Sequence, residues 1–90
     1  MSSSGESYHL TISTPGGNVF SDEVTCLILR GLEGDLAVLK GHIPFATAVK
    51  PGPCTITTED GGLIKSEIGG GLLSVGSDSV TLMTGSYKAV

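Results

Sequence analysis

The stretch Asn18-Val-Phe-Ser-Asp-Glu-Val-Thr-Cys-Leu-Ile-Leu-Arg30 decides the fold class, because it is the longest part of the chain without glycine or proline. Its thirteen residues would suffice for a helix of average length. Its apolar side chains, however, do not recur at helical spacing, and from Val24 to Leu29 they form a run of β-branched and bulky types. The one window in which a helix could form therefore predicts β-structure.

Glycine and proline divide the rest of the chain into short segments. Fourteen glycines and four prolines leave no other stretch longer than nine residues, which is below the mean helix length of about 11–12. Residues 8–14 alternate, with Leu10 and Ile12 on one face. We expect an all-β domain, a two-sheet antiparallel β-sandwich of about nine to ten short strands. The predicted strands cover residues 8–14, 19–23, 24–30, 35–39, 45–49, 54–58, 63–68, 72–75 and 80–84.

Turn residues separate these strands. Residues 15–18 and 50–53 combine proline with glycine and predict turns, and residues 59–62 predict the loop of a hairpin. The three glycines at 69–71 predict a bulge or a close backbone approach, since no Gly-Lys-Ser/Thr follows to make a phosphate loop. We expect one domain over residues 8–85, between a flexible N-terminal segment, 1–7, and a C-terminal tail, 86–90.

Charge and hydrophobicity exclude several classes of protein. Five basic and nine acidic residues give a net charge of −4, which argues against binding to nucleic acid or to an anionic membrane surface. No apolar run approaches the roughly 20 residues of a membrane span, so no lipid insertion is expected. The first residues lack a basic patch and an apolar core, so they do not resemble a signal peptide. We expect a soluble, acidic, intracellular domain.

The residues that could carry chemistry do not form a recognisable catalytic or metal-binding pattern. Cys26, Cys54, His9 and His42 lack the short spacings of zinc ligands, and we interpret the cysteines as buried apolar side chains whose pairing stays open. His42 is the only histidine in a predicted loop, and no Gly-x-Ser-x-Gly elbow accompanies it. We therefore expect no catalytic residues, no metal and no cofactor.

Large apolar residues lie at or near predicted loop tips. Leu32, Ile43 and Phe45 are such residues in a chain with only four aromatic side chains, and polar residues surround them. Exposed apolar residues within a polar rim favour a docking surface, and hence an interaction module. Two other hypotheses remain open: a free-standing β-sandwich that binds sugar or peptide, although the chain has no Trp and only two Tyr, and a small β-barrel metalloenzyme, which would require a metal.

A series of short segments carries a family resemblance. Gly31-Leu-Glu-Gly-Asp-Leu-Ala-Val-Leu39 is close to the pattern G-x-E-G-E-L-G-I-L, and Gly41-His-Ile-Pro44 stands where that family has G-H-A-P. Lys50-Pro-Gly52, Gly70-Gly-x-Leu-x-Val75 and Val80-Thr-Leu82 follow in the same register. The chain thus resembles, over about residues 8–84, the N-terminal β-sandwich domain of the epsilon subunit of F-type ATP synthases, called delta in mitochondria. The departures from the pattern are Asp35, Ala37, Lys40 and Phe45.

The resemblance implies a mechanical function. Members of this family are non-catalytic subunits of the rotor, which join the gamma subunit of the central stalk to the membrane ring of c subunits. The family's C-terminal pair of helices, which can inhibit ATP hydrolysis or bind ATP, is missing here, so neither property is expected. The resemblance also implies a peripheral position on the cytoplasmic face of the bacterial inner membrane, with no small-molecule substrate.

The resemblance further implies two sets of contact residues. For the c-ring interface it implies Leu32, Glu33, Asp35 and Lys40. For the gamma-subunit interface it implies Thr14, His42, Pro44, Phe45 and Thr47, with Phe45 as the expected anchor.

Overall fold

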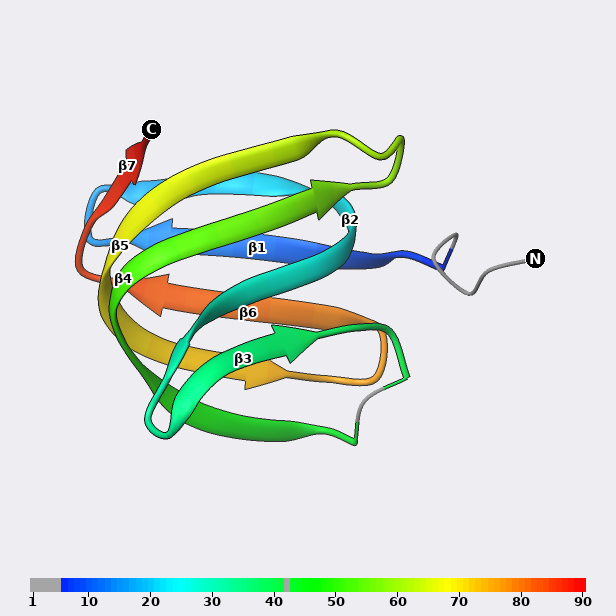
Figure 1. Cartoon of the computed structure of the whole chain (residues 1–90), viewed down its shortest axis with the longest axis horizontal. Coiled ribbons are helices and arrows are strands. Elements are labelled where there is room, and N and C mark those ends of the chain that lie inside the picture. Colours follow the sequence, from blue (N-terminus) through cyan, green and yellow to red (C-terminus); the bar gives the residue numbers. More distant parts are fainter. Residues whose placement is uncertain (1–5, 42) are drawn as a thin grey trace.

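The computed structural model of the chain describes residues 6–41 and 43–90, and these residues form β-structure without a helix (Figure 1). The all-β expectation is therefore confirmed. None of these described segments could span a lipid bilayer as a helix. The seven strands are β1 (Tyr8–Thr14), β2 (Gly17–Gly31), β3 (Gly34–Val38), β4 (Phe45–Thr58), β5 (Leu63–Val75), β6 (Ser79–Thr84) and β7 (Tyr87–Ala89).

The prediction of nine to ten short strands is wrong, because three predicted breaks lie inside long strands. Strand β2 continues through residues 23 and 24, β4 through residues 50–53, and β5 through residues 69–71. In β4 the partner strand β2 pairs with Val49 and then with Cys54, so the four residues between them bulge away from it. Pro51 and Pro53 fit there because a proline lacks the N–H that a second neighbouring strand would need. The predicted turn is thus a bend within one strand.

The strands close into a five-membered ring. Their order is β1-β6-β5-β4-β2, and β1 also pairs with β2, while β3 is added to the outside of β2 and β7 to β5. Strand β1 is antiparallel to β2 but parallel to β6, so the expectation of a purely antiparallel sandwich is corrected. Figure 1 shows β4 and β5 bending together around one end of the molecule. The sandwich is therefore barrel-like and closed along the side that β1 occupies.

The core fills the space inside this ring. Leu10 and Ile12 of β1 have 0% exposure, as the alternation of residues 8–14 predicts. The Tyr8 hydroxyl donates a hydrogen bond of 2.7 Å to the Val38 carbonyl and so ties β1 to the end of β3. The other fully buried large side chains come from the five strands β2 to β6: Val24, Leu27, Leu29, Val38, Ile56, Leu73 and Leu82.

Glycine permits a close approach between β5 and β6. Gly71 has a φ of 151°, and a Cβ there would overlap the carbonyl oxygen of Met83. The neighbouring Gly70 carbonyl accepts a hydrogen bond from the Thr84 hydroxyl. The expectation of a close backbone approach at residues 69–71 is confirmed.

The cysteines are free thiols that lie at different positions along β2 and β4. Cys54 is 1% exposed and fits the interpretation as a buried apolar side chain, whereas Cys26 is only half-buried. In the pairing of the two strands, Cys26 lies opposite Thr57, and Cys54 opposite Leu29. Burial raises the pKa of both thiols. The part of the chain that the structure describes contains no group of three or more acidic, His or Cys side chains that could hold a metal ion.

Candidate partner-binding groove

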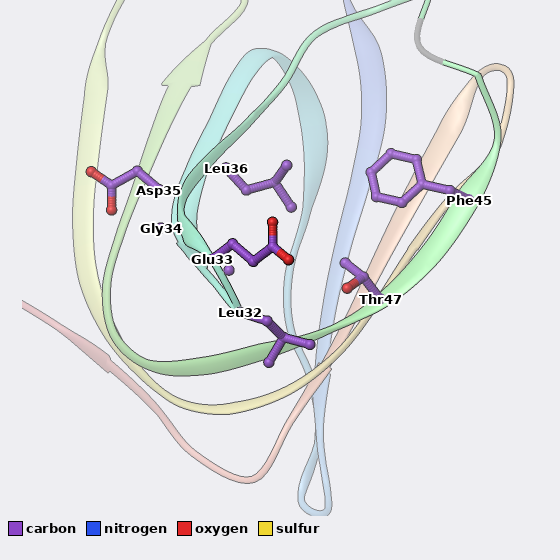
Figure 2. A pocket seen from close by; sticks show the side chains of 8 residues that line it. Leu32, Glu33, Gly34, Asp35, Leu36, Phe45 and Thr47 are labelled. Atoms are coloured by element: carbon purple, nitrogen blue, oxygen red, sulfur yellow. The ribbon is translucent and has the colours of Figure 1, made fainter.

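A groove opens where the ring carries its extra strand β3. Its volume is about 360 Å³, near the lower end of the 300–1,000 Å³ that small-molecule sites occupy. One wall is the β2–β3 hairpin and the other is the first part of β4 (Figure 2). The lining residues are Gly31, Leu32, Glu33, Gly34, Asp35, Leu36, Phe45 and Thr47.

A two-residue loop forms the first wall. Gly31 pairs with Gly34 across the hairpin, and Leu32 and Glu33 make the turn between them. Gly34 has a φ of 130°, a conformation that favours glycine, and a Cβ at Gly31 would lie only 3.0 Å from the Gly34 carbonyl oxygen. The tight turn holds Leu32 out in solvent with 57% of its surface exposed.

Strand β4 forms the second wall. Phe45 pairs with Val75 and Thr47 with Leu73, so their side chains point toward the inner side of the sheet. Figure 2 shows the Phe45 ring and the Leu36 side chain pointing toward one another across the groove. Both are half-buried and pack against the core. The groove therefore has apolar walls that are continuous with the hydrophobic core.

The two acidic residues of the hairpin lie on different sides of it. In Figure 2 the Glu33 carboxylate points into the groove, whereas the Asp35 carboxylate points away from Phe45 and Thr47. Asp35 forms an ion pair with Arg30, at 3.4 Å between Oδ1 and Nε, and both side chains are well exposed. Glu33 forms no ion pair with any residue that the structure describes. The groove thus has one unneutralised carboxylate at its mouth.

The groove brings together residues from both predicted interfaces. Leu32, Glu33 and Asp35, predicted for the c-ring, lie around the same opening as Phe45 and Thr47, predicted for gamma. Phe45 begins strand β4 beside the loop, as predicted, but it is half-buried, so the expectation that it is exposed is wrong. Leu32 and Ile43 are exposed as expected, at 57% and 82%. The sequence analysis did not identify Leu36 as a site residue. Its neighbours, the charged Asp35 and the small Ala37, do not indicate that Leu36 lines a groove.

The remaining predicted residues lie elsewhere. Thr14 lies at the β1–β2 turn, where its hydroxyl donates to the Gly17 carbonyl, and it lines a separate hollow that also includes Met83. Lys40 and Pro44 are exposed in the connection between β3 and β4. The prediction for His42 lies outside the described residues.

An uncharged face joins Thr14 to β4 across the outside of the ring. In register, Ser13 lies beside Met83, Met83 beside Leu72, and Leu72 beside Ala48. The next row along contains Ala46, Ser74 and Thr81. We call these seven residues the uncharged face; all are exposed or half-buried. The alternation of residues 72–75 and 80–84 is the sequence signal that would have located it.

Comparisons with known proteins agree with this architecture. Residues 7–89 match the family described as the β-sandwich domain of the ATP synthase delta/epsilon chain. An ATP synthase epsilon chain from Chlorobium limicola is 36% identical over 84 residues, covering 93% of this chain and 96% of the relative. An ATP synthase epsilon chain from Streptomyces griseus is 32% identical over 75 residues. That match covers 83% of this chain, which spans only 60% of the Streptomyces protein.

Two solved structures contain the same fold. A chain in the structure of the Euglena gracilis mitochondrial ATP synthase, described as OSCP/F1/c-ring, matches 92% of this chain with a TM-score of 0.87 and 24% identity; the match covers 53% of that chain. A chain in the central stalk/c-ring structure of the Tetrahymena thermophila mitochondrial ATP synthase matches 91%, with a TM-score of 0.75 and 14% identity, and the match covers 66% of it. On the sequence matches and this fold, the chain belongs to the family of ATP synthase delta/epsilon chain β-sandwich domains.

Proposed function

We propose that this chain is a non-catalytic subunit in the central stalk of a rotary ATP synthase. It links the gamma subunit to the c-ring and so couples ion translocation to ATP synthesis. The observation that carries this proposal is the family match over residues 7–89, which includes every strand, together with the near full-length match to an epsilon chain. The proposed place is peripheral, on the cytoplasmic face of the bacterial inner membrane.

The closed ring suits a part that transmits torque. Each strand of the ring pairs with a neighbour on both sides, and the core inside it is made of fully buried apolar side chains. Close-packed interiors have low compressibility, so such a body transmits strain instead of absorbing it. The proposed function needs stiffness and adhesive surfaces, and it requires no active site, metal, nucleotide or cofactor.

The proposed gamma surface is the uncharged face together with the residues at its two borders. Thr14 borders it beside Ser13 and Met83. At the other border, Phe45 and Thr47 alternate along β4 with residues of the uncharged face, and Pro44 directly precedes β4. His42 belongs to the same predicted set. This arrangement supports one continuous contact, because interface cores are depleted in charged residues and these positions carry none.

The proposed c-ring surface is the β2–β3 hairpin and the connection that follows β3. Leu32 supplies an exposed apolar contact at the hairpin tip, while Glu33, Asp35 and Lys40 supply charge. Exposed charges at the rim of an interface raise the rate of association more than they raise affinity. We therefore assign orientation and steering, and little of the binding free energy, to these three charged residues.

Reconstitution tests the proposal directly. The complete synthase of the source organism is assembled in vesicles with and without this chain, and ATP synthesis is measured for a fixed ion gradient. We expect assemblies without the chain to lose coupling, and the chain to co-purify with gamma when present. Equal synthesis in both preparations, with no retention of the chain on gamma, would contradict the proposal.

A further inference from the structure

One backbone edge of strand β3 pairs with no other strand in the described part of the chain. Among the described residues β3 pairs only with β2, in a hairpin that begins at the Gly31–Gly34 pair. Antiparallel ladders alternate between hydrogen-bonded and non-hydrogen-bonded pairs, and the pair that flanks a two-residue loop is hydrogen-bonded. Because Gly34 is in a hydrogen-bonded pair, Asp35 and Ala37 are in non-hydrogen-bonded pairs with β2. Their N–H and C=O groups therefore point away from β2. They form an open template for another strand.

The partner-binding groove runs beside this edge. Leu36, which lies between Asp35 and Ala37, points into the groove toward Phe45, and the Glu33 carboxylate stands at its mouth (Figure 2). An extended segment on the β3 edge could therefore place alternate side chains in the groove. Strand addition in general gains affinity from main-chain hydrogen bonds and specificity from pockets for alternate side chains.

We propose that β3 and the groove bind an extended segment of the gamma subunit, which adds a strand to the free edge of β3. The segment carries an aliphatic side chain that fits between Leu36 and Phe45, and a Lys or Arg that pairs with Glu33. Glu33 is thereby reassigned from the c-ring surface to gamma, because its carboxylate points into the groove. Charge complementarity supports the basic residue, since Glu33 is not neutralised by any described residue. This inference rests on the proposed function and deepens it.

Continuity along β4 identifies gamma as the source of the segment. Ala46 and Ala48 belong to the uncharged face, and Phe45 and Thr47 of the same strand line the groove. The uncharged face is the proposed gamma surface, so a gamma subunit that covers it can extend around the edge of β4 into the groove. The Asp35 carboxylate points to the other side of the hairpin. Asp35 therefore stays assigned to the c-ring surface.

Hydrogen exchange with a matched pair of variants tests this inference. Exchange of the Asp35 and Ala37 amides is measured in the full chain alone and in complex with purified gamma, and binding is measured for Ala37→Pro and Ala37→Ser. We expect both amides to be protected in the complex. Ala37→Pro removes one N–H donor and should weaken gamma binding about tenfold, whereas Ala37→Ser keeps the donor and should change it less than about twofold.

A charge pair adds a second readout. Glu33→Gln should weaken gamma binding and reduce the salt dependence of that binding, whereas Asp35→Asn should leave both unchanged.

The Ala37→Pro variant needs a check that it folds. A proline at an edge position whose N–H points outward is compatible with the fold, and thermal melting of the variant tests this.

The outcomes separate the two proposals. If gamma fails to bind the unaltered chain, the proposed function is wrong. If gamma binds but the β3 amides exchange as fast as in the free chain, strand addition is wrong and the proposed function stands. If purified c-ring protects these amides and gamma does not, the assignment of the segment to gamma is wrong.

Discussion

The two halves of strand β2 have different surroundings. Its first half pairs with β1, which continues to β6 and closes the ring, and the β1 side chains Leu10 and Ile12 are fully buried. Its second half carries β3, whose far edge pairs with no other described strand, and Leu36 and Phe45 beside it are only half-buried. We call the region of β1, β6 and the first half of β2 the closed side, and the region of β3 and the groove the open side. The closed side stabilises the fold, whereas the open side has a strand edge and apolar side chains that a partner can bind.

The largest expected effect comes from a substitution on the closed side, Gly71→Ala. The new Cβ would overlap the Met83 carbonyl oxygen at a backbone φ that disfavours side chains, so we expect a loss of about 3–5 kcal/mol in the free energy of unfolding. Urea denaturation measures it. Gly34→Ala on the open side has a similar φ but no atom within 4 Å, and should cost only about 1–2 kcal/mol. Equal losses for the two variants would show that the two sides do not differ.

A smaller loss is expected from Tyr8→Phe, which cuts the link between the closed side and β3. The substitution leaves the buried Val38 carbonyl without its 2.7 Å hydrogen bond, and should cost about 1–3 kcal/mol in the free energy of unfolding. Tyr87→Phe serves as the control, because Tyr87 is half-buried and no described hydrogen bond uses its hydroxyl. We expect that variant to stay within about 0.5 kcal/mol of the parent. A Tyr8→Phe protein as stable as Tyr87→Phe would argue against a structural role for the hydroxyl.

The same tyrosine predicts a loss of stability in alkali. Burial, with a smaller contribution from Cys26 and Cys54, raises the pKa of Tyr8 far above its ordinary value of 10.0. Above about pH 10 the unfolded chain releases this proton while the folded chain retains it, so the free energy of unfolding falls as the pH rises. Denaturation from about pH 8 to about pH 11 should show this fall, and Tyr8→Phe should reduce it, leaving the part that the thiols of Cys26 and Cys54 contribute. An identical slope in both proteins would assign the fall to other groups.

On the open side, Phe45→Ala should affect binding. Removing a half-buried aromatic anchor should weaken gamma binding by about 1–2 kcal/mol, or roughly five- to thirtyfold. Calorimetric titration with gamma measures the change. Leu63→Ala is a matched control, because Leu63 is 63% exposed on β5 and lines neither the groove nor the uncharged face. Unchanged binding by Phe45→Ala would remove this residue from the interface.

The smallest effect is expected from Asp35→Asn. Its carboxylate is exposed and already pairs with Arg30, so its loss should slow association with the c-ring no more than about threefold. The difference should vanish at high salt because exposed charges are screened. Asp78→Asn, in the β5–β6 connection, should leave the association rate unchanged. A faster dissociation, with an unaltered association rate, would contradict a steering role.

Local patterns in the sequence predicted the class of fold and part of its core. Alternation in residues 8–14 correctly placed Leu10 and Ile12 inside, and residues 59–62 form the predicted hairpin, in which the Thr58 N–H donates to the Gly62 carbonyl at 2.8 Å. The strand count failed because glycine and proline mark a bend as readily as a turn, and only pairing with a distant strand distinguishes the two. Residues 50–53 show this, since their bulge exists only relative to β2.

The candidate site was predictable only in pieces. The hairpin residues Leu32 and Glu33 follow from a local motif, but the wall that faces them comes from β4. The opposite directions of the Glu33 and Asp35 carboxylates depend on where the two-residue loop ends and the alternation of β3 begins. These features arise from register, which a single sequence does not show.

The parallel pairing of β1 with β6 has a consequence for how the molecule is made. His9 lies opposite Ser79 in that ladder, so the strand that leaves the ribosome early finds one of its two neighbours only after some seventy more residues have been translated. Contacts so distant along the chain slow folding and leave strand edges exposed meanwhile. The β1–β2 hairpin can form early, but the barrel can close only after β6 has been translated.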